Sequence, residues 1–271
     1  MKAAPFEYRQ PQSAAQAVAM LGASEMAKAC GGSQSLGPML NLRLAQVDCL
    51  VDLSRIEALT GFSEGTQALR IGAGVTHARI EDGELPDVTR GLLPRVAAGI
   101  AYRAVRNRGT VGGSLAHADP AADWVNTMCL LDAAVVVLGA TGERRVLASE
   151  FFLGPFTTVL APDDVIVAVE VPRFSSRARW AYRKTCRKPG EFADAIAAAW
   201  VDPERGIARA LIGALGGMPH LVDGEAALAG LRRAGGPARA LDDAGVTGDY
   251  EREVHAVMLR RALDDLDRFP P

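Results

Sequence analysis

Residues 105–123 read VRNRGTVGGSLAHADPAAD and join a glycine-rich segment to the start of a strong helix pattern. The paired glycines, Gly112 and Gly113, stand between the hydroxyls of Thr110 and Ser114. Paired glycines leave the backbone bare and free to adopt unusual angles, so successive N–H groups and small hydroxyls can converge on an anion. The segment therefore predicts a loop that cradles a phosphate.

A helix is expected directly after this loop. Asp119 suits the N-cap, and Pro120 suits the first helical position, where a backbone N–H would have no partner. The residues that follow, AADWVNTMCLLDA, are largely apolar. Asp123 falls in the first turn, and two interpretations of its carboxylate stay open. It accepts hydrogen bonds from a ribose diol, or it stabilises the positive end of the helix dipole.

A second glycine pair lies upstream, in the sequence GGSQS at residues 31–35. It follows a short apolar run and precedes the helical pattern of residues 36–44. Alone, this segment is equally compatible with a tight turn. Two such segments, each carrying hydroxyls and each beside a helix start, predict one ligand whose diphosphate is held from both sides.

Outside these segments, helix and strand patterns alternate. Ser13 and Gly22 bound a predicted helix, and PRFSSR at residues 172–177 is predicted to be a linker. Strands are expected at residues 27–30, 49–53, 68–71, 134–138, 144–147, 165–171, 180–185, 193–201 and 207–215, and helices at 92–101, 225–232 and 249–267. Helices and strands in two unequal blocks are typical of an α+β fold.

Composition and charge exclude several classes of protein. With a net charge of −2 and 49% hydrophobic residues, the chain is expected to be globular and to bind neither nucleic acid nor an acidic membrane. Its four cysteines form no CxxC pair and its four histidines no HExxH pair, so no iron–sulfur cluster or other metal is expected on this chain. The sequence shows no signal peptide and no apolar run of about 18 residues, which predicts a cytoplasmic protein.

Three further signals are weaker. Residues 72–77, GAGVTH, begin like a dinucleotide-binding fingerprint, but His77 replaces the third glycine and no acid follows at the expected distance. His117 and its neighbouring aspartates are too small a ligand set for a metal ion. The basic run at residues 177–188 is either a solvated strand edge or a surface that complements a phosphate or a partner subunit.

The two glycine segments together resemble a known family. GGSQSLGPMLNLRLA at residues 31–45 and the segment 105–123 are similar to the FAD-binding medium subunit of molybdenum hydroxylases. This family includes the carbon monoxide dehydrogenase medium subunit and the flavin domain of xanthine dehydrogenase. The similarity continues at residues 157–172, 182–195 and 216–219, so it covers nearly the whole chain.

The resemblance implies a particular α+β architecture. Residues 1–175 would form a two-lobed FAD-binding domain of the p-cresol methylhydroxylase type, with the lobes split near residues 55–60. Residues 176–271 would form a small α+β C-terminal domain of the carbon monoxide dehydrogenase flavoprotein type.

The resemblance also implies which residues bind FAD, and it assigns none to catalysis or to a metal. Ile100 would make an apolar contact, Asp123 would lie in the ribose and diphosphate region, and the backbone of Leu160 would meet the flavin. Lys184 would stand near the ring system, although Arg183 takes that place after a shift of one residue. The implied FAD-binding residues are Gly31, Gly32, Ser33, Gln34, Ser35, Ile100, Thr110, Val111, Gly112, Gly113, Ser114, Asp123, Leu160 and Lys184.

The function implied by the resemblance is that of a flavoprotein subunit of a molybdenum-containing dehydrogenase. Such a subunit passes electrons from iron–sulfur centres on a partner to an external acceptor. The molybdenum cofactor and two clusters of the 2Fe–2S type are expected on a large and a small partner subunit, in a dimer of heterotrimers. One alternative is a self-contained FAD-dependent oxidoreductase of the same fold, which the short C-terminal block disfavours. Another is an interaction protein that has lost the cofactor, which the two intact glycine segments disfavour.

Overall fold

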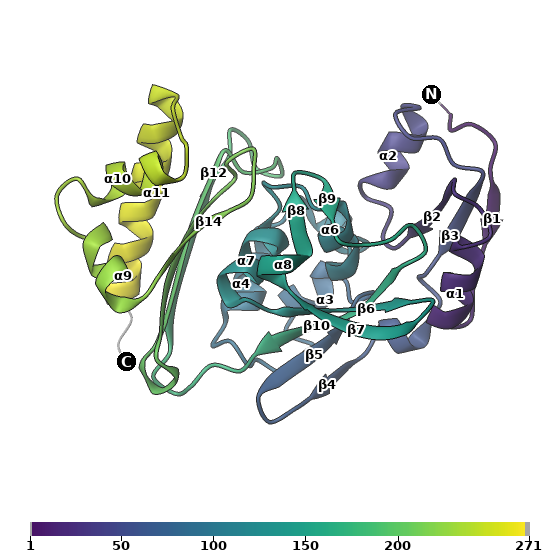
Figure 1. Ribbon diagram of the computed structural model, residues 1–271, viewed down its shortest axis with the longest axis horizontal. Helices are drawn as coiled ribbons and strands as arrows, with labels where there is room; N and C mark the ends of the chain where they lie inside the picture. The colour runs from purple at the N-terminus through teal and green to yellow at the C-terminus, as the bar shows by residue number, and fades with distance from the viewer. Residues whose placement is uncertain (1, 269–271) are drawn as a thin grey trace.

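The computed structural model describes residues 2–268. Figure 1 shows three successive parts along the long axis, each built around its own sheet. The first sheet is parallel, with the strand order β1 (Glu7–Arg9), β3 (Cys49–Asp52), β2 (Ala27–Cys30). Helix α1 (Ala14–Leu21) packs against this sheet, α2 (Leu36–Asn41) follows β2, and a short 3₁₀ helix (Glu57–Leu59) leads out of this part.

The second sheet is antiparallel and lies at the centre of the molecule. Its strand order is β4 (Phe62–Glu64), β5 (Ala68–Gly72), β10 (Val165–Pro172), β6 (Ala134–Gly139), β7 (Gly142–Leu147). The chain between β5 and β6 forms the helices α3 (His77–Glu81), α4 (Leu92–Ala98), α5 (Arg103–Arg106), α6 (Val111–His117) and α7 (Asp123–Leu131). The helix α8 (Ala148–Phe151) and a small hairpin of β8 (Phe152–Gly154) and β9 (Thr157–Thr158) precede β10.

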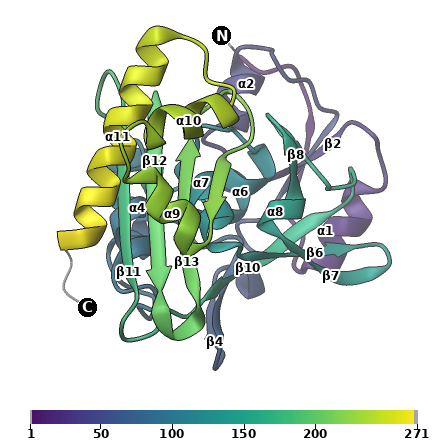
Figure 2. The ribbon, with the colours of Figure 1, turned by 60° about the vertical axis from the view of Figure 1, so that its left-hand side comes forward.

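The third part is a four-stranded antiparallel sheet with helices on its outer face. The strand order is β11 (Arg179–Thr185), β12 (Ala195–Asp202), β13 (Ile207–Gly213), β14 (His220–Asp223), with a 3₁₀ turn at Pro203–Arg205. In Figure 2 the helices α9 (Glu225–Leu231), α10 (Gly236–Asp243) and α11 (Asp249–Arg268) lie in front of the sheet, and α4 and α7 lie behind it. No helix among residues 2–268 is long and apolar enough to cross a membrane.

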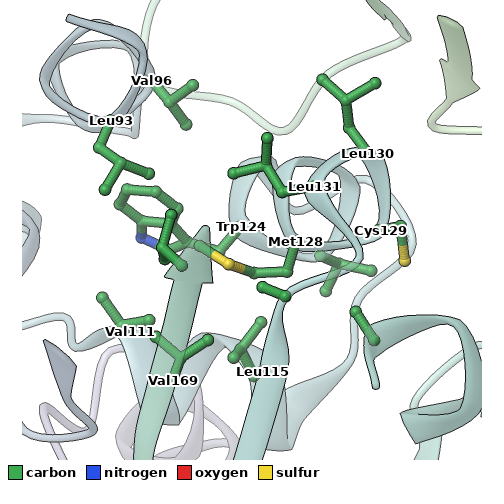
Figure 3. Packing of buried hydrophobic residues seen from close by; sticks show 14 of the residues in the cluster. Leu93, Val96, Val111, Leu115, Trp124, Met128, Cys129, Leu130, Leu131 and Val169 are labelled. Atoms are coloured by element: carbon green, nitrogen blue, oxygen red, sulfur yellow. The ribbon is translucent and has the colours of Figure 1, made fainter. Parts of the chain in front are cut away.

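Helix α7 joins the central part to the third. Every residue of α7 is buried, because the helix is packed against α4, α6 and β10 and also against β12 and β13. A helix that is covered on all sides needs apolar residues all round, and WVNTMCLL supplies most of them. Figure 3 shows Trp124 and Met128 of α7 pointing toward Leu115 and Val169. The first residue of this buried helix is Asp123, so its carboxylate is held in the interior of the protein.

The strand β12 shows why the third sheet is covered on both faces. Side chains alternate between the two faces of a strand. Ile196 and Trp200 belong to the same apolar cluster as α7, whereas Ala197 and Ala199 belong to the cluster formed with Leu259 of α11. The alanines let α11 pack closely against the sheet.

At helix α1 the capping residues correctly predicted where the helix begins and ends. The side chain of Ser13 accepts a hydrogen bond from the backbone N–H of Gln16, and α1 ends before Gly22, as predicted. The expected strands are all present, with shifted bounds. β12 begins at Ala195 rather than at residue 193, and β7 begins at Gly142. Predicted helices are shorter at residues 36–44 and 92–101, where α2 ends at Asn41 and α4 at Ala98.

Two predictions about the segment 105–123 were wrong. The glycine pair is not in a loop, because Thr110 caps α6 and places both glycines in its first turn. The next helix does not begin at Pro120. Asp119 instead caps a turn, accepting a hydrogen bond from the N–H of Ala121 at 2.9 Å, and α7 begins only at Asp123. Asp119 is a good capping residue, but here it caps a turn, and the N-cap of α7 is Ala122, whose side chain makes no capping hydrogen bond.

Candidate functional site

A pocket of about 300 Å³ lies where the first sheet meets the central sheet. Its walls come from the ends of β2, β3 and β5, the start of α6 and the chain that enters β10. Six residues implied by the sequence line it: Gly31, Gly32, Thr110, Gly112, Gly113 and Leu160. Both glycine segments therefore meet at one pocket.

The two glycine segments also pack against each other. A Cβ atom at Gly32 would lie 1.9 Å from the carbonyl oxygen of Arg108, and one at Gly31 would lie 2.9 Å from Oγ1 of Thr110. At Gly112 a Cβ atom would lie 2.5 Å from the Cβ atom of Ala73. Glycine is therefore required for the close approach of these backbones.

The backbone N–H groups of the two segments differ in what they bind. Among the hydrogen bonds of the described residues, none has the backbone N–H of Gly32, Ser33, Gln34 or Ser35 as its donor. Ser33 has a φ of 60° and lies in the left-handed region, and alternation of such conformations turns successive N–H groups toward one side of the chain. Gly31 and Gly32 line the pocket, and Ser33, Gln34 and Ser35 do not. The segment therefore offers a run of unpaired donors that begins at the pocket wall.

In the second segment the corresponding N–H groups already have partners. Val111 donates to the carbonyl of Val75 at 3.1 Å, and Gly112 donates to the carbonyl of Ala73 at 2.9 Å. Gly113 donates to Oγ1 of Thr110 at 3.1 Å. Val111 is fully buried in the core, and Ser114 is half-buried on α6. This segment builds a wall of the pocket through its bare glycines and the Thr110 hydroxyl rather than through free N–H groups.

A second cluster contains three of the implied residues that do not line the pocket. The carboxylate of Asp123 accepts a hydrogen bond from Nζ of Lys184 at 2.8 Å on one oxygen and from the hydroxyl of Tyr182 at 2.7 Å on the other. The stem of Lys184 passes Gly99, where a Cβ atom would lie 3.5 Å from its Cε. Gly99 precedes Ile100, so Ile100 follows directly on the backbone that the Lys184 stem passes. Helix α6 begins at the pocket, and the chain leaving it leads to Asp123.

The register of β11 separates Lys184 from its neighbour. Lys184 faces α7 and pairs with Asp123, whereas Arg183 points to the other side of the strand and pairs with Asp265 of α11. The basic run at 177–188 is therefore not one surface. Arg187 lies 3.5 Å from the nearby Glu191 on the exposed side. Acids pair with three cations of the run, and two of these acids, Asp123 and Asp265, come from distant parts of the chain.

Several residues that line the pocket were not singled out from the sequence. Gly74 and Thr76 belong to the segment 72–77, which was rejected as a dinucleotide fingerprint and still forms part of the wall. Asp164 is buried at the pocket and accepts two hydrogen bonds from Arg144, which holds the pKa of that carboxyl below its usual value. Gly72 and Gly74 were the only sequence signal that could have predicted Gly74 and Thr76 as pocket residues. Asp164 had none, because its position depends on β10.

A buried histidine lies beneath the second glycine segment. Nδ1 of His77 accepts a hydrogen bond from the indole N–H of Trp124 at 2.9 Å, and its backbone N–H donates to the carbonyl of Gly109. Burial, together with the charge of Arg106, lowers the pKa of His77 to about 4. His77 is therefore neutral at pH 7 and supports the residues that lead into α6. No group of three or more metal-ligating side chains occurs among residues 2–268.

Comparisons with known proteins agree with this geometry. Residues 4–174 match a family model described as the FAD binding domain in molybdopterin dehydrogenase. The chain is 39% identical over 191 residues to the carbon monoxide dehydrogenase medium chain of Hydrogenophaga pseudoflava, covering 70% of this chain and 67% of that protein. It is 34% identical to the nicotine 6-hydroxylase medium subunit of Paenarthrobacter nicotinovorans, covering 94% of this chain and 91% of that protein.

Solved structures show the same similarity over nearly the full length. A chain of the carbon monoxide dehydrogenase from Hydrogenophaga pseudoflava superposes with a TM-score of 0.87 at 33% identity, covering 98% of both chains. A chain of quinoline 2-oxidoreductase from Pseudomonas putida 86 superposes with a TM-score of 0.86 at 31% identity, again covering 98% of both chains. These superpositions confirm the predicted fold class.

Proposed function

Because the chain belongs to the family of FAD-binding domains in molybdopterin dehydrogenases, we propose that it is the electron-transfer subunit of a multi-subunit molybdenum hydroxylase. It receives electrons from iron–sulfur centres on a partner subunit and passes them to an external acceptor. FAD supplies the redox chemistry on this chain, and the protein supplies binding, orientation and electrostatics. A large molybdenum subunit and a small iron–sulfur subunit are its partners, in a cytoplasmic dimer of heterotrimers.

The residues of the pocket fit the diphosphate of FAD. The unpaired N–H groups of residues 32–35 are hydrogen-bond donors for phosphate oxygens, and they lie at the end of β2 beside a bare glycine. The glycine wall at residues 112–113 leaves space for the diphosphate because no side chain projects from it. The meeting of these two segments at one pocket is the observation that carries the proposal.

The other implied residues would hold the rest of the cofactor. Leu160 lines the same pocket, and its backbone contacts the flavin in this proposal. Ile100 and Lys184 would provide an apolar contact and a cation for the flavin. Asp123, which the resemblance assigns to the ribose and diphosphate region, is paired with Lys184, and in this proposal it acts by holding that cation. We place the boundary between the FAD-binding and C-terminal domains at residue 175 and the split between the lobes at 55–60. The limits of the three sheets support both divisions.

In the third part of the chain the sheet is covered by α7 on one face and by α11 on the other, so neither face of this sheet is open to a substrate. A pocket of about 300 Å³ lies between α10 and α11, on the far side of α11 from the proposed FAD site. The organic substrate is therefore expected to react on a partner subunit, which separates the proposed function from that of a self-contained flavoenzyme.

An anaerobic reduction experiment tests the proposal. The purified chain, loaded with FAD, is mixed with candidate organic substrates, and the flavin absorbance is followed with and without the co-expressed partner chains. We expect bleaching only in the complex, and we expect it to require intact iron–sulfur clusters on the partner. Rapid bleaching of the lone chain would identify a self-contained flavoenzyme instead. A chain that never acquires a flavin spectrum would contradict any flavin function.

A further inference from the structure

Tyr182 is a buried tyrosine beside Asp123 and Lys184. It lies on β11, its side chain is enclosed by the apolar cluster around α7, and its hydroxyl donates to Asp123 Oδ1 at 2.7 Å. Burial, together with the neighbouring carboxylate, raises the pKa of Tyr182 well above its usual value. The hydroxyl therefore stays protonated and acts as a permanent donor.

The carboxylate of Asp123 needs this donor. Asp123 is buried, and a carboxylate removed from water is costly unless its oxygens accept hydrogen bonds. Each oxygen has one side-chain partner, Tyr182 on Oδ1 and Lys184 on Oδ2. With Tyr182 in place, the carboxylate plane is fixed from two sides.

The same strand supplies both partners. Tyr182 and Lys184 are two residues apart on β11 and therefore project from the same face, toward the first turn of α7. A lysine side chain is long and flexible, and it loses much rotamer freedom when it is held in one position. A carboxylate locked by a rigid tyrosine gives the ammonium group one preferred place to bind.

From this arrangement we infer that Tyr182 is a positioning residue for FAD. Through its hydrogen bond to Asp123, it fixes the ammonium group of Lys184 at the flavin end of the site. The inference rests on the proposed function, because it needs FAD to lie beside Lys184. A fixed cation beside the ring favours the reduced flavin, which carries more negative charge, so the reduction potential reports its placement.

The variant Tyr182→Phe removes only the hydroxyl and tests the inference in the complete FAD-loaded chain. We expect the dissociation constant for FAD to rise about tenfold, because the ammonium group of Lys184 is no longer held in place before FAD binds. We also expect the midpoint potential of the bound flavin to become more negative. Tyr8→Phe is the matched control, since Tyr8 also donates to a carboxylate, that of Asp52, in the first sheet. We expect this control to keep the wild-type potential.

A double variant separates positioning from a merely structural effect. Lys184→Met should shift the potential in the same direction and further than Tyr182→Phe does. If Tyr182 acts through Lys184, then Tyr182→Phe added to Lys184→Met should cause no additional shift. An additional shift of the original size would overturn the inference, as would a wild-type potential in either single variant.

A replacement variant and a wild-type control distinguish failure of this inference from misfolding and from failure of the proposed function. If Tyr182→Phe does not fold, Asp123→Asn tests the same chain of contacts, because it keeps an oxygen that accepts the tyrosine hydrogen bond and removes the charge that holds Lys184. We expect a potential shift in this variant too, and a wild-type potential would reject the inference. A wild-type chain that binds no FAD would instead refute the proposed function itself.

Discussion

The two glycine segments look alike in the sequence and differ in the structure. Residues 31–35 form an open turn whose N–H groups from Gly32 to Ser35 have no partner among the described residues. In the other segment Gly112 and Gly113 lie in the first turn of a helix, where their N–H groups are bonded to Ala73 and Thr110. A paired glycine with flanking hydroxyls therefore indicates close approach of backbone. It does not indicate whether another part of the chain or a ligand comes close.

Gly32→Ala should have the largest effect of the changes considered, because it forces the two segments apart. The added Cβ would lie 1.9 Å from the carbonyl oxygen of Arg108 and 2.8 Å from Cα of Gly109, and neither backbone atom can move alone. We expect a loss of about 3 kcal/mol in the free energy of unfolding and loss of stoichiometric FAD. Urea unfolding and the flavin-to-protein absorbance ratio measure these effects. Wild-type stability would show that the segments are not in contact.

Gly112→Ala should cost less, since the new Cβ would meet the Cβ atom of Ala73 at 2.5 Å. We expect a loss of about 2 kcal/mol from overpacking. The double variant with Ala73→Gly removes the opposing atom and should recover part of the lost stability. If the second change gives no recovery, the packing explanation for Gly112 is wrong.

Acid should destabilise the folded protein through His77, the buried histidine that supports the segment leading into α6. The pKa of His77 is about 4 in the folded protein and 6.5 in its ordinary state, so the unfolded chain binds the extra proton between these values. The contribution of His77 to the free energy of unfolding is therefore fully present above pH 6.5 and is lost as the pH falls toward 4. From pH 7 to pH 5 this group should contribute a loss of about 2 kcal/mol. Unfolding curves of wild type and His77→Gln measure it, since glutamine keeps an acceptor for Trp124. Equal pH slopes in both proteins would contradict the assignment.

Gly113→Ala should have the smallest effect on stability and still affect FAD. A Cβ at this exposed position would meet only the Oγ1 atom of Thr110, at 2.9 Å, and alanine is a better helix former than glycine by up to about 1 kcal/mol. We expect stability within about 1 kcal/mol of wild type and weaker FAD binding. The bulkier Gly113→Leu should give a folded, colourless protein. A folded Gly113→Leu chain that retains one FAD per protein would remove this wall from the binding site.

The sequence predicted helix ends correctly where a few adjacent residues determine them. Ser13 capped its helix as predicted because capping depends on residues three positions apart. Asp119 and Pro120 matched a helix start, but α7 begins at Asp123, because the helix is packed between two sheets.

Long-range contacts account for the parts of the site that the sequence did not predict. The choice between Lys184 and Arg183 depends on the register of β11, which puts one beside Asp123 and the other beside Asp265. Asp164 and Thr76 reach the pocket from the ends of β10 and β5, strands that pair across about a hundred residues of sequence. The resemblance to the family supplied residue roles, and the structure grouped them into a pocket and a separate charged cluster.

Hydrogen exchange of individual backbone amides, measured by NMR with and without FAD, tests the difference between the two segments most directly. Amides exchange slowly when they are hydrogen-bonded and fast when they are exposed. We predict that Gly32, Ser33, Gln34 and Ser35 exchange fast in the FAD-free chain and become protected when FAD binds. Gly112 should be protected in both states, because its N–H is already bonded to Ala73. Amides of residues 32–35 that exchange equally fast with and without bound FAD would contradict the assignment of this segment as the phosphate-binding one.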